Sequence, residues 1–132
     1  MSDVKCATML IRAAERDIAA LWFMRDSGEI CHEVFGFHVQ QAAEKMLKAH
    51  LALLGVEYPL THNIEALLDL LAERGITPEP FGKLIDYTPY AVEFRYQGVG
   101  PDAEPIDREG ALRLVEIVLE QVTRELARDE RE

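Results

Sequence analysis

The centre of the chain carries a strip of polar side chains whose types suit the binding of an anion. His38, Gln41, Lys45 and Lys48 follow one another at spacings of three and four residues. On a helix these positions fall within about 80° of arc and form one face. Lysine supplies positive charge, and Gln and His supply hydrogen bonds, so the strip can hold a phosphate or a nucleobase. The alternative is a solvated helix face on which Glu44 and Lys48 form an ordinary i,i+4 ion pair.

Arg95 is the second candidate for binding an anion. It is in phase with the apolar positions of a helix predicted to start near Thr77, so its guanidinium would point into or across a helical bundle. A half-buried arginine needs an acceptor, and Asp17, Asp86 and Glu93 are the candidates. Arg95 therefore forms either a structural ion pair with one of these carboxylates or a clamp for an anion that faces the strip.

The sequence lacks the usual patterns of catalytic and metal-binding sites. It has no glycine-rich phosphate loop after a strand, and its only serines, Ser2 and Ser27, lie in no nucleophile elbow. The four histidines include no pair at i,i+4, which argues against a structural zinc site. Cys6 and Cys31 are too few for a disulfide framework and are predicted to be reduced thiols. We therefore expect no metal and no cofactor.

Composition and charge narrow the class of protein. The chain has 132 residues, 48% of them hydrophobic and 29% charged, which is typical of one folded domain. Its 24 acidic and 14 basic side chains give a net charge of −10, which argues against extended DNA binding and against binding to an anionic membrane. The first 50 residues carry seven acids against six bases, so an anion is least repelled there. With no secretory signal and no run long enough to span a bilayer, we expect a soluble cytoplasmic protein.

The hydrophobic periodicity is helical almost throughout and predicts an all-α fold. Apolar stripes indicate helices over about residues 7–22, 30–54, 64–74, 77–95 and 107–126, with a surface loop over 97–105. The expected architecture is an antiparallel up-and-down bundle of four long helices plus one short helix. We expect one domain over residues 1–132, with a core over about 7–126 and a frayed tail over 127–132.

Two details of these helices bear on the site. The helix over 30–54 is apolar over about half of its circumference, which favours a dimer interface on it. Thr61, His62 and Asn63 are candidate capping residues for the helix that follows. His38, beside the apolar stripe, also suits a structural role, and His62 suits capping or packing.

Three motifs, in this order along the chain, resemble the HEPN domain (higher eukaryotes and prokaryotes nucleotide-binding). They are the segment Phe37 to Ala49, the run Thr61 to Ile64 and the pair Arg95-Tyr96; the segment Ala14 to Ile18 is also similar to the opening of that family. The resemblance covers about residues 7–126. It implies an α-helical up-and-down bundle, usually a homodimer. It also implies frequent pairing with a minimal nucleotidyltransferase encoded alongside, often as a toxin–antitoxin system.

Many HEPN proteins are metal-independent ribonucleases, and this chain departs from their motif. The motif is an Arg followed after four to six residues by a His. Arg95 matches the Arg, but positions 100 to 102 hold Gly100, Pro101 and Asp102. RNA cleavage through the 2′-hydroxyl needs a general acid or base that titrates near neutral pH, which is typically His. Asp102 would need a raised pKa, and His38 can substitute only if its helix faces Arg95.

The residues and the resemblance together favour a binding or partner module over an enzyme. The predicted function is a dimeric HEPN protein that binds a nucleotide or RNA phosphate through Arg95, Lys45, Lys48, His38 and Gln41, with a nucleotidyltransferase as partner. Two alternatives stay open. One is a degenerate ribonuclease that uses Arg95 with His38 or Asp102. The other is a purely structural dimerising scaffold.

Overall fold

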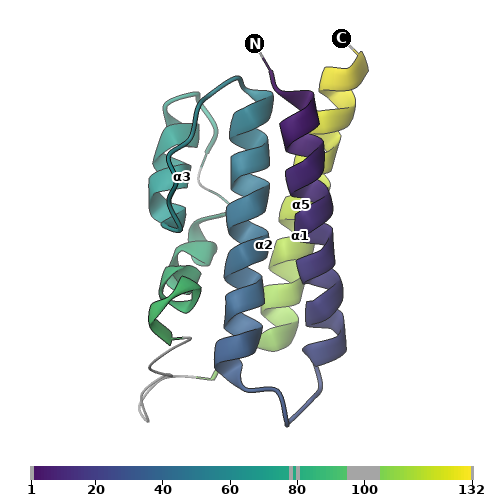
Figure 1. Ribbon diagram of the computed structural model, residues 1–132, viewed down its shortest axis with the longest axis vertical. Helices are drawn as coiled ribbons and strands as arrows, with labels where there is room; N and C mark the ends of the chain where they lie inside the picture. The colour runs from purple at the N-terminus through teal and green to yellow at the C-terminus, as the bar shows by residue number, and fades with distance from the viewer. Residues whose placement is uncertain (1, 78, 80, 95–104, 132) are drawn as a thin grey trace.

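The structure, a computed structural model, describes residues 2–77, 79, 81–94 and 105–131, which form five helices and no strand (Figure 1). The long helices are α1 (Val4–Met24), α2 (His32–Leu53) and α5 (Arg108–Arg131), and the shorter ones are α3 (Ile64–Ala72) and the 3₁₀ helix η1 (Phe81–Ala91). The predicted all-α class is confirmed. No helix of the described residues is both long enough and apolar enough to cross a membrane.

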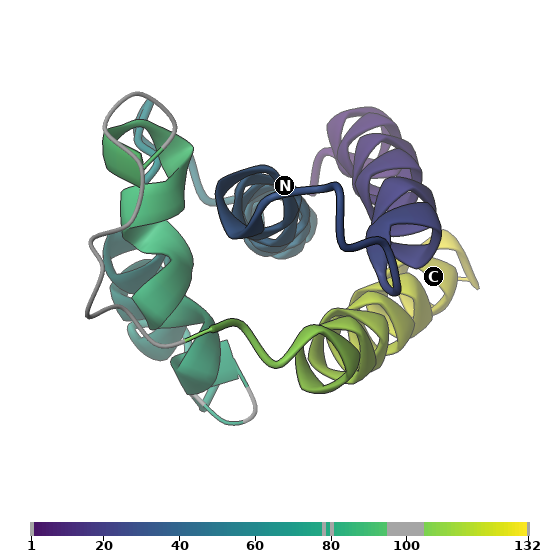
Figure 2. The same ribbon diagram turned by 90° about the horizontal axis from the view of Figure 1, so that it is seen from below.

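α2 is the central helix of the bundle. It packs against α1 and α5 on one side and against α3 and η1 on the other (Figure 2). Most of its residues are buried, including Phe35, Val39, Met46 and Leu47, which are fully enclosed. The sequence predicts a dimer interface on the broad apolar surface of α2. In the structure this surface is buried by contacts within one chain.

The sequence predicts four long helices and one short one, whereas the described residues form three long helices and two shorter ones. Within the described residues, α3 and η1 follow one another along one side of α2, where a regular bundle has one long helix (Figure 1). Gly75, at φ 81°, follows α3 in the left-handed conformation that favours glycine. Pro89 lies inside η1 and lacks the N–H that an α-helix would need there.

Local side-chain contacts fix where helices begin. Asp3 caps α1 by accepting a hydrogen bond from the amide of Cys6 at 3.0 Å. Of the three predicted caps of α3, Asn63 takes this position and accepts a hydrogen bond from the amide of Ala66 at 3.2 Å. Both caps can be predicted from the local sequence, because each side chain accepts a hydrogen bond from an amide in the same turn.

Residues 127–131, for which the sequence predicts fraying, continue α5 as helix in the structure. Two contacts hold this end. The hydroxyl of Ser2 donates to a carboxylate oxygen of Asp129 at 3.0 Å, and Arg128 lies 3.8 Å from Glu125 one helical turn earlier. The Ser2 contact joins the two ends of the chain, which lie side by side in Figure 1.

Arg108, the first residue of α5, fixes the connection between α1 and α2. Its guanidinium donates to the backbone carbonyls of Met24 at 2.7 Å, Ser27 at 3.1 Å and Ile30 at 2.6 Å. It also lies over the ring of Phe35, 5.0 Å from the centroid. One arginine therefore links the connection between α1 and α2 to the start of α5.

Candidate functional site

The first cluster of functional side chains lies between α1 and α2, around Asp17. Lys45 donates from Nζ to Asp17 Oδ2 at 2.6 Å, and His38 Nδ1 lies 2.9 Å from Asp17 Oδ1. Asp17 is buried, whereas His38 and Lys45 are each partly exposed. Burial alone would raise the pKa of Asp17, but the hydrogen bonds and charges of His38 and Lys45 outweigh it and hold that pKa below its ordinary value.

The second cluster lies between α2 and the start of α3, around Glu44. Lys48 Nζ donates to Glu44 Oε2 at 2.9 Å, and His62 Nδ1 lies 2.8 Å from Glu44 Oε1. The ammonium of Lys48 also lies over the ring of Tyr58, 5.5 Å from the centroid. Burial alone would raise the pKa of Glu44. The hydrogen bonds from Gln40, His62 and Lys48 more than offset this effect, so the pKa is lowered.

Two glutamines complete the second cluster. The amide of Gln40, which is fully buried, donates to Glu44 Oε1 at 2.9 Å and to the backbone carbonyl of His62 at 3.0 Å. Its carbonyl oxygen accepts a hydrogen bond from Gln41 Nε2 at 2.7 Å. The buried polar atoms of this cluster therefore satisfy one another and join α2 to the start of α3.

In both clusters a carboxylate lies against Nδ1 of a histidine. A carboxylate accepts a hydrogen bond from a protonated ring nitrogen, so this contact favours a proton on Nδ1 and leaves Nε2 as the other polar atom of the ring. His38 keeps part of its ring exposed, and the side chain of His62 is 60% exposed. Each histidine is thus oriented by its carboxylate and accessible from solvent, with a lysine bound to the same carboxylate.

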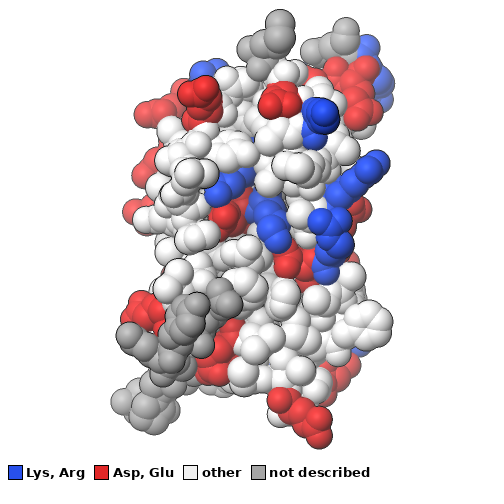
Figure 3. Space-filling model, viewed as in Figure 1, with Lys and Arg blue, Asp and Glu red and all other residues white. Residues whose placement is uncertain are grey.

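Further cations lie on the exposed face of α1. Lys5, Arg12 and Arg16 are exposed and line one shallow cavity of about 680 Å³ together with Asp3 and Met9. Within the part of the chain that the structure describes, none of the three cations pairs with a carboxylate. Figure 3 shows Lys and Arg side chains gathered across the middle of the face that α1 and α2 present.

Across residues 2–77, 79, 81–94 and 105–131, no group of three or more His, Cys, Asp or Glu side chains is arranged to hold a metal ion. Carboxylates and histidines do meet in the two clusters, but each pair is accompanied by a lysine ammonium rather than by a third ligand. Each described cluster therefore combines a carboxylate with a lysine and a histidine.

Comparison with known proteins identifies the family of this chain. The family model described as HEPN domain matches residues 7–126. The chain belongs to the HEPN family. Its structure is similar to the crystal structure of an archaeal HEPN homologue, with a TM-score of 0.60 and 24% sequence identity, over 96% of this chain and 99% of that one. This similarity shows a shared fold. A comparison with curated proteins gave no match.

The segments that carry the HEPN resemblance are those that build the two clusters. Asp17 comes from the segment Ala14 to Ile18, and the run Thr61 to Ile64 supplies His62. The segment Phe37 to Ala49 supplies the side chains of α2 in both clusters. The third motif, Arg95-Tyr96, lies outside the described residues, as does Asp102.

The structure separates the predicted strip of α2 into two parts. His38 and Lys45 meet at Asp17, whereas Lys48 and Gln41 belong to the cluster around Glu44. The predicted i,i+4 pair of Glu44 and Lys48 is present, but both residues are buried rather than on a solvated face.

The central role of the two carboxylates is not evident from the sequence. The sequence indicates Asp17 only as an acceptor for Arg95, and Glu44 only as a surface partner of Lys48. A signal for Asp17 is its place beside the apolar stripe of α1, where an uncompensated charge would be costly. The sequence predicts a capping or packing role for His62, and its contact with Glu44 depends on how α3 lies against α2.

Proposed function

We propose that this HEPN-domain protein binds the phosphate groups of a nucleotide or of RNA on the face formed by α1 and α2, and that it acts as a binding or partner module. One observation supports this most directly. In a chain with a net charge of −10, basic side chains gather on this face, and Lys5, Arg12 and Arg16 there have no carboxylate partner among the described residues (Figure 3). Unpaired exposed cations are free to contact phosphate.

The predicted ligand residues take different roles in this proposal. Lys45 and His38 are partly exposed beside the α1 cations, so they can contact a phosphate directly while Asp17 holds them in place. Lys48 is enclosed by Glu44 and Tyr58, and Gln41 is bonded to Gln40, so both act by positioning α2. Arg95 remains a proposed phosphate ligand on the family pattern alone.

A titration of ATP, GTP and a short single-stranded RNA tests the proposal. The variants are Arg12→Gln with Arg16→Gln combined, Arg95→Ala, and Arg74→Gln as the control. Arg74 is an exposed arginine after α3 that has no carboxylate partner among the described residues. We expect affinity to fall about tenfold or more in the first two variants and to be unchanged in the control. Equal affinity in all proteins, or no binding by the wild type, would contradict the proposal.

A second candidate function, a degenerate ribonuclease, is favoured by the contact between His38 and Asp17. This arrangement orients a partly exposed imidazole that can serve as a general base. RNA digestion in the presence of a metal chelator should then disappear in both His38→Gln and Arg95→Ala. Digestion that is unchanged in these variants would reflect contamination.

Assembly is a further part of the proposal. A second copy of the chain and a nucleotidyltransferase are the proposed partners, as the family resemblance implies, and the proposed location is the cytoplasm. Exposed apolar side chains offer contact surface, among them Phe23 on α1, which is 90% exposed. Sedimentation of the protein alone tests the dimer, and co-purification with the enzyme tests the pairing. A monomer at all concentrations would refute the first part.

The purely structural alternative also has support, because the two clusters join helices and satisfy their own polar groups. It predicts that variants of the outer cations change no binding at all, while variants of Asp17 and Glu44 lower stability. The titration above separates the two cases, since Arg12 and Arg16 make no contact in either cluster.

A further inference from the structure

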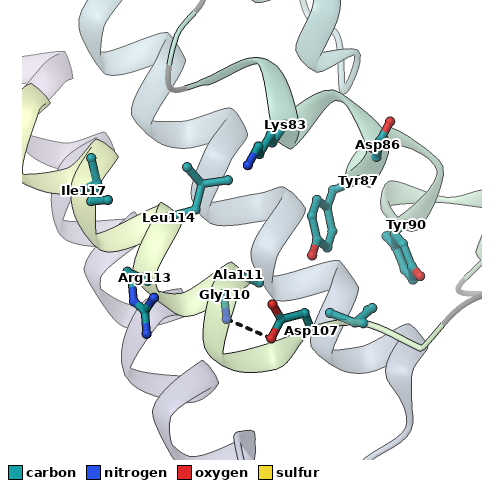
Figure 4. A pocket seen from close by; sticks show the side chains of 11 residues that line it. Lys83, Asp86, Tyr87, Tyr90, Asp107, Gly110, Ala111, Arg113, Leu114 and Ile117 are labelled. Carbon is teal, nitrogen blue, oxygen red and sulfur yellow. Dashed lines mark hydrogen bonds between the residues drawn. The ribbon is translucent and has the colours of Figure 1, made fainter.

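The helices α3 and η1 form a layer of their own in the molecule. They pack extensively against α2 and against one another, whereas α1, α2 and α5 all pack against each other (Figure 2). A groove of about 720 Å³ separates η1 from α5, and Lys83 and Tyr87 border it on one side and Leu114 on the other (Figure 4). Within the described part of the chain, α2 is therefore the main support of this layer.

The three-helix core, made of α1, α2 and α5, is tied together at both ends. The amide of Asp3, just before α1, donates to the carbonyl of Ala52 near the end of α2 at 2.8 Å, and Ser2 binds Asp129 on α5. At the opposite end, Arg108 binds three backbone carbonyls at and after the end of α1. The first cluster joins α1 to α2 between these points. None of these ties involves α3 or η1.

The layer is held on α2 by a polar contact at α3 and an aromatic contact at η1, in addition to apolar packing. At α3, Gln40 donates to the backbone carbonyl of His62 at 3.0 Å, and Glu44 lies 2.8 Å from the ring of His62. At η1, the buried ring of Tyr90 lies so close to Gly36 that a Cβ there would be 2.3 Å from it. Each helix of the layer thus has its own point of attachment to α2.

The two helices of the layer are also joined to each other. The hydroxyl of Thr88, in η1, accepts a hydrogen bond from the amide of Ile64, the first residue of α3, at 3.2 Å. This amide is one of those that a helix cannot satisfy by itself. Because η1 is a 3₁₀ helix that contains Pro89, its own backbone hydrogen bonds are weaker than those of an α-helix. Each helix therefore depends on the other, and we expect them to leave α2 together.

The connection between α2 and α3 offers a hinge for such a movement. The hydroxyl of Tyr58 lies 3.4 Å from Sγ of Cys6 on α1, so the first part of the connection stays with the core. Pro59 and Leu60 follow and are exposed, and the side chain of Leu60 is 100% exposed. Rotation at these two residues moves α3 without breaking a contact of the core.

We propose that α3 and η1 form a clasp that opens from α2 as one unit while the three-helix core stays folded. The closed clasp covers the face of α2 that carries Gln40 and Glu44. Leu47 and Leu51, which are fully buried, follow these residues at spacings of three and four and so share this face. Opening releases His62 from Glu44 and uncovers an apolar helix face that is hidden in the closed form. The device does not depend on which ligand the α1–α2 face binds.

Amide hydrogen exchange of the full chain, followed by NMR under native conditions, measures this opening. We expect the slow amides of α3 and η1 to share one protection factor, about tenfold or more below that of α1 and α5. Glu44→Gln alters the contact with α3 and Gly36→Ala alters the contact with η1. Each variant should nevertheless speed exchange in both helices by the same factor, about tenfold or more.

Two controls separate clasp opening from unfolding of the whole chain. Ile11→Val, in the buried face of α1, should speed exchange of α1 and α5 by about threefold or more and leave α3 and η1 unchanged. In the wild type, low concentrations of urea should speed exchange of α1 and α5 more steeply than that of α3 and η1, because global unfolding exposes more surface. The urea series needs no variant, so it tests the clasp even if a substitution prevents folding.

Three results would overturn this inference. The first is exchange of α3 and η1 that is as slow and as sensitive to urea as that of α1 and α5, which would show that the layer leaves α2 only in global unfolding. The second is a variant that speeds exchange only in the helix that it contacts, which would show two independent elements. The third is an equal effect of Ile11→Val on the clasp and on the core.

Discussion

A conservative substitution of Glu44 should lower the stability of the fold more than the same kind of change at most other positions. Its carboxylate accepts hydrogen bonds from Gln40 and Lys48 and lies 2.8 Å from His62. The side chains of Glu44 and Lys48 are only 9% and 11% exposed. Glu44→Gln keeps the shape but leaves the Lys48 ammonium without its counter-charge in a poorly solvated place. Breaking a buried pair by removing one partner costs about 3–5 kcal/mol, and the retained amide oxygen reduces this to about 2–4 kcal/mol.

For a chain of this length, such a loss corresponds to a fall in Tm of about 10 °C. Thermal and urea unfolding measure it. The matched control is Glu120→Gln, which removes an exposed i,i+4 partner of Arg124 and should cost less than about 0.5 kcal/mol. Adding Lys48→Met to Glu44→Gln should restore part of the loss, because the stranded charge is then gone. If Glu44→Gln costs no more than Glu120→Gln, the buried cluster does not stabilise the fold as described.

Three other substitutions probe the fold and its pH dependence. The lowered pKa of Asp17 means that its stabilising effect is present above its ordinary value of 3.8 and is lost as the pH falls through the folded-state value. Asp17→Asn should therefore lower Tm at pH 7 and differ little from wild type in strong acid; a constant difference would be contrary evidence. Burial lowers the pKa of His50 from 6.5, so the unfolded chain takes up this proton first and stability falls as the pH drops below 6.5. His50→Leu should remove that part of the acid sensitivity in urea unfolding between pH 7 and 5, and a profile identical to wild type would argue against it. A Cβ at Gly36 would lie 2.3 Å from the ring of Tyr90, so Gly36→Ala should cost about 1–3 kcal/mol despite better helix propensity. Gly28→Ala, in open space, is the control, and equal stability of the two variants would refute the close contact.

Much of the fold follows from the sequence because helical periodicity is a local property. The apolar stripe of residues 7–22 lies within α1, and that of 30–54 corresponds closely to α2. The region after α3 was harder to predict, since periodicity alone does not distinguish an α-helix from the 3₁₀ helix that contains Pro89. The hydrogen bond of Ser2 to Asp129, at the end of α5, joins residues far apart in the sequence, so periodicity does not predict it.

The candidate site was predictable in its residue types but not in its pairing. The spacing of His38, Lys45 and Lys48 predicts one polar helix face. In the structure His38 and Lys45 meet Asp17, whereas Lys48 meets Glu44. Which carboxylate each cation meets depends on the rotation and position of α1 and α3 against α2. The chain has 24 acidic side chains, and nothing in their spacing singles out Asp17 as the partner of Lys45. These pairings are determined by packing between helices, which the periodicity of a single helix does not specify.

The salt dependence of RNA affinity tests most directly whether the α1–α2 face contacts phosphate. Each phosphate contact to a single strand contributes about 0.7 to the slope of log affinity against log salt concentration. Combined Arg12→Gln and Arg16→Gln substitution should therefore weaken binding of a short single-stranded RNA and reduce the slope by about 1.4, while Arg74→Gln leaves it unchanged. A slope equal to that of the wild type in the double variant would show that phosphate is not bound by these cations.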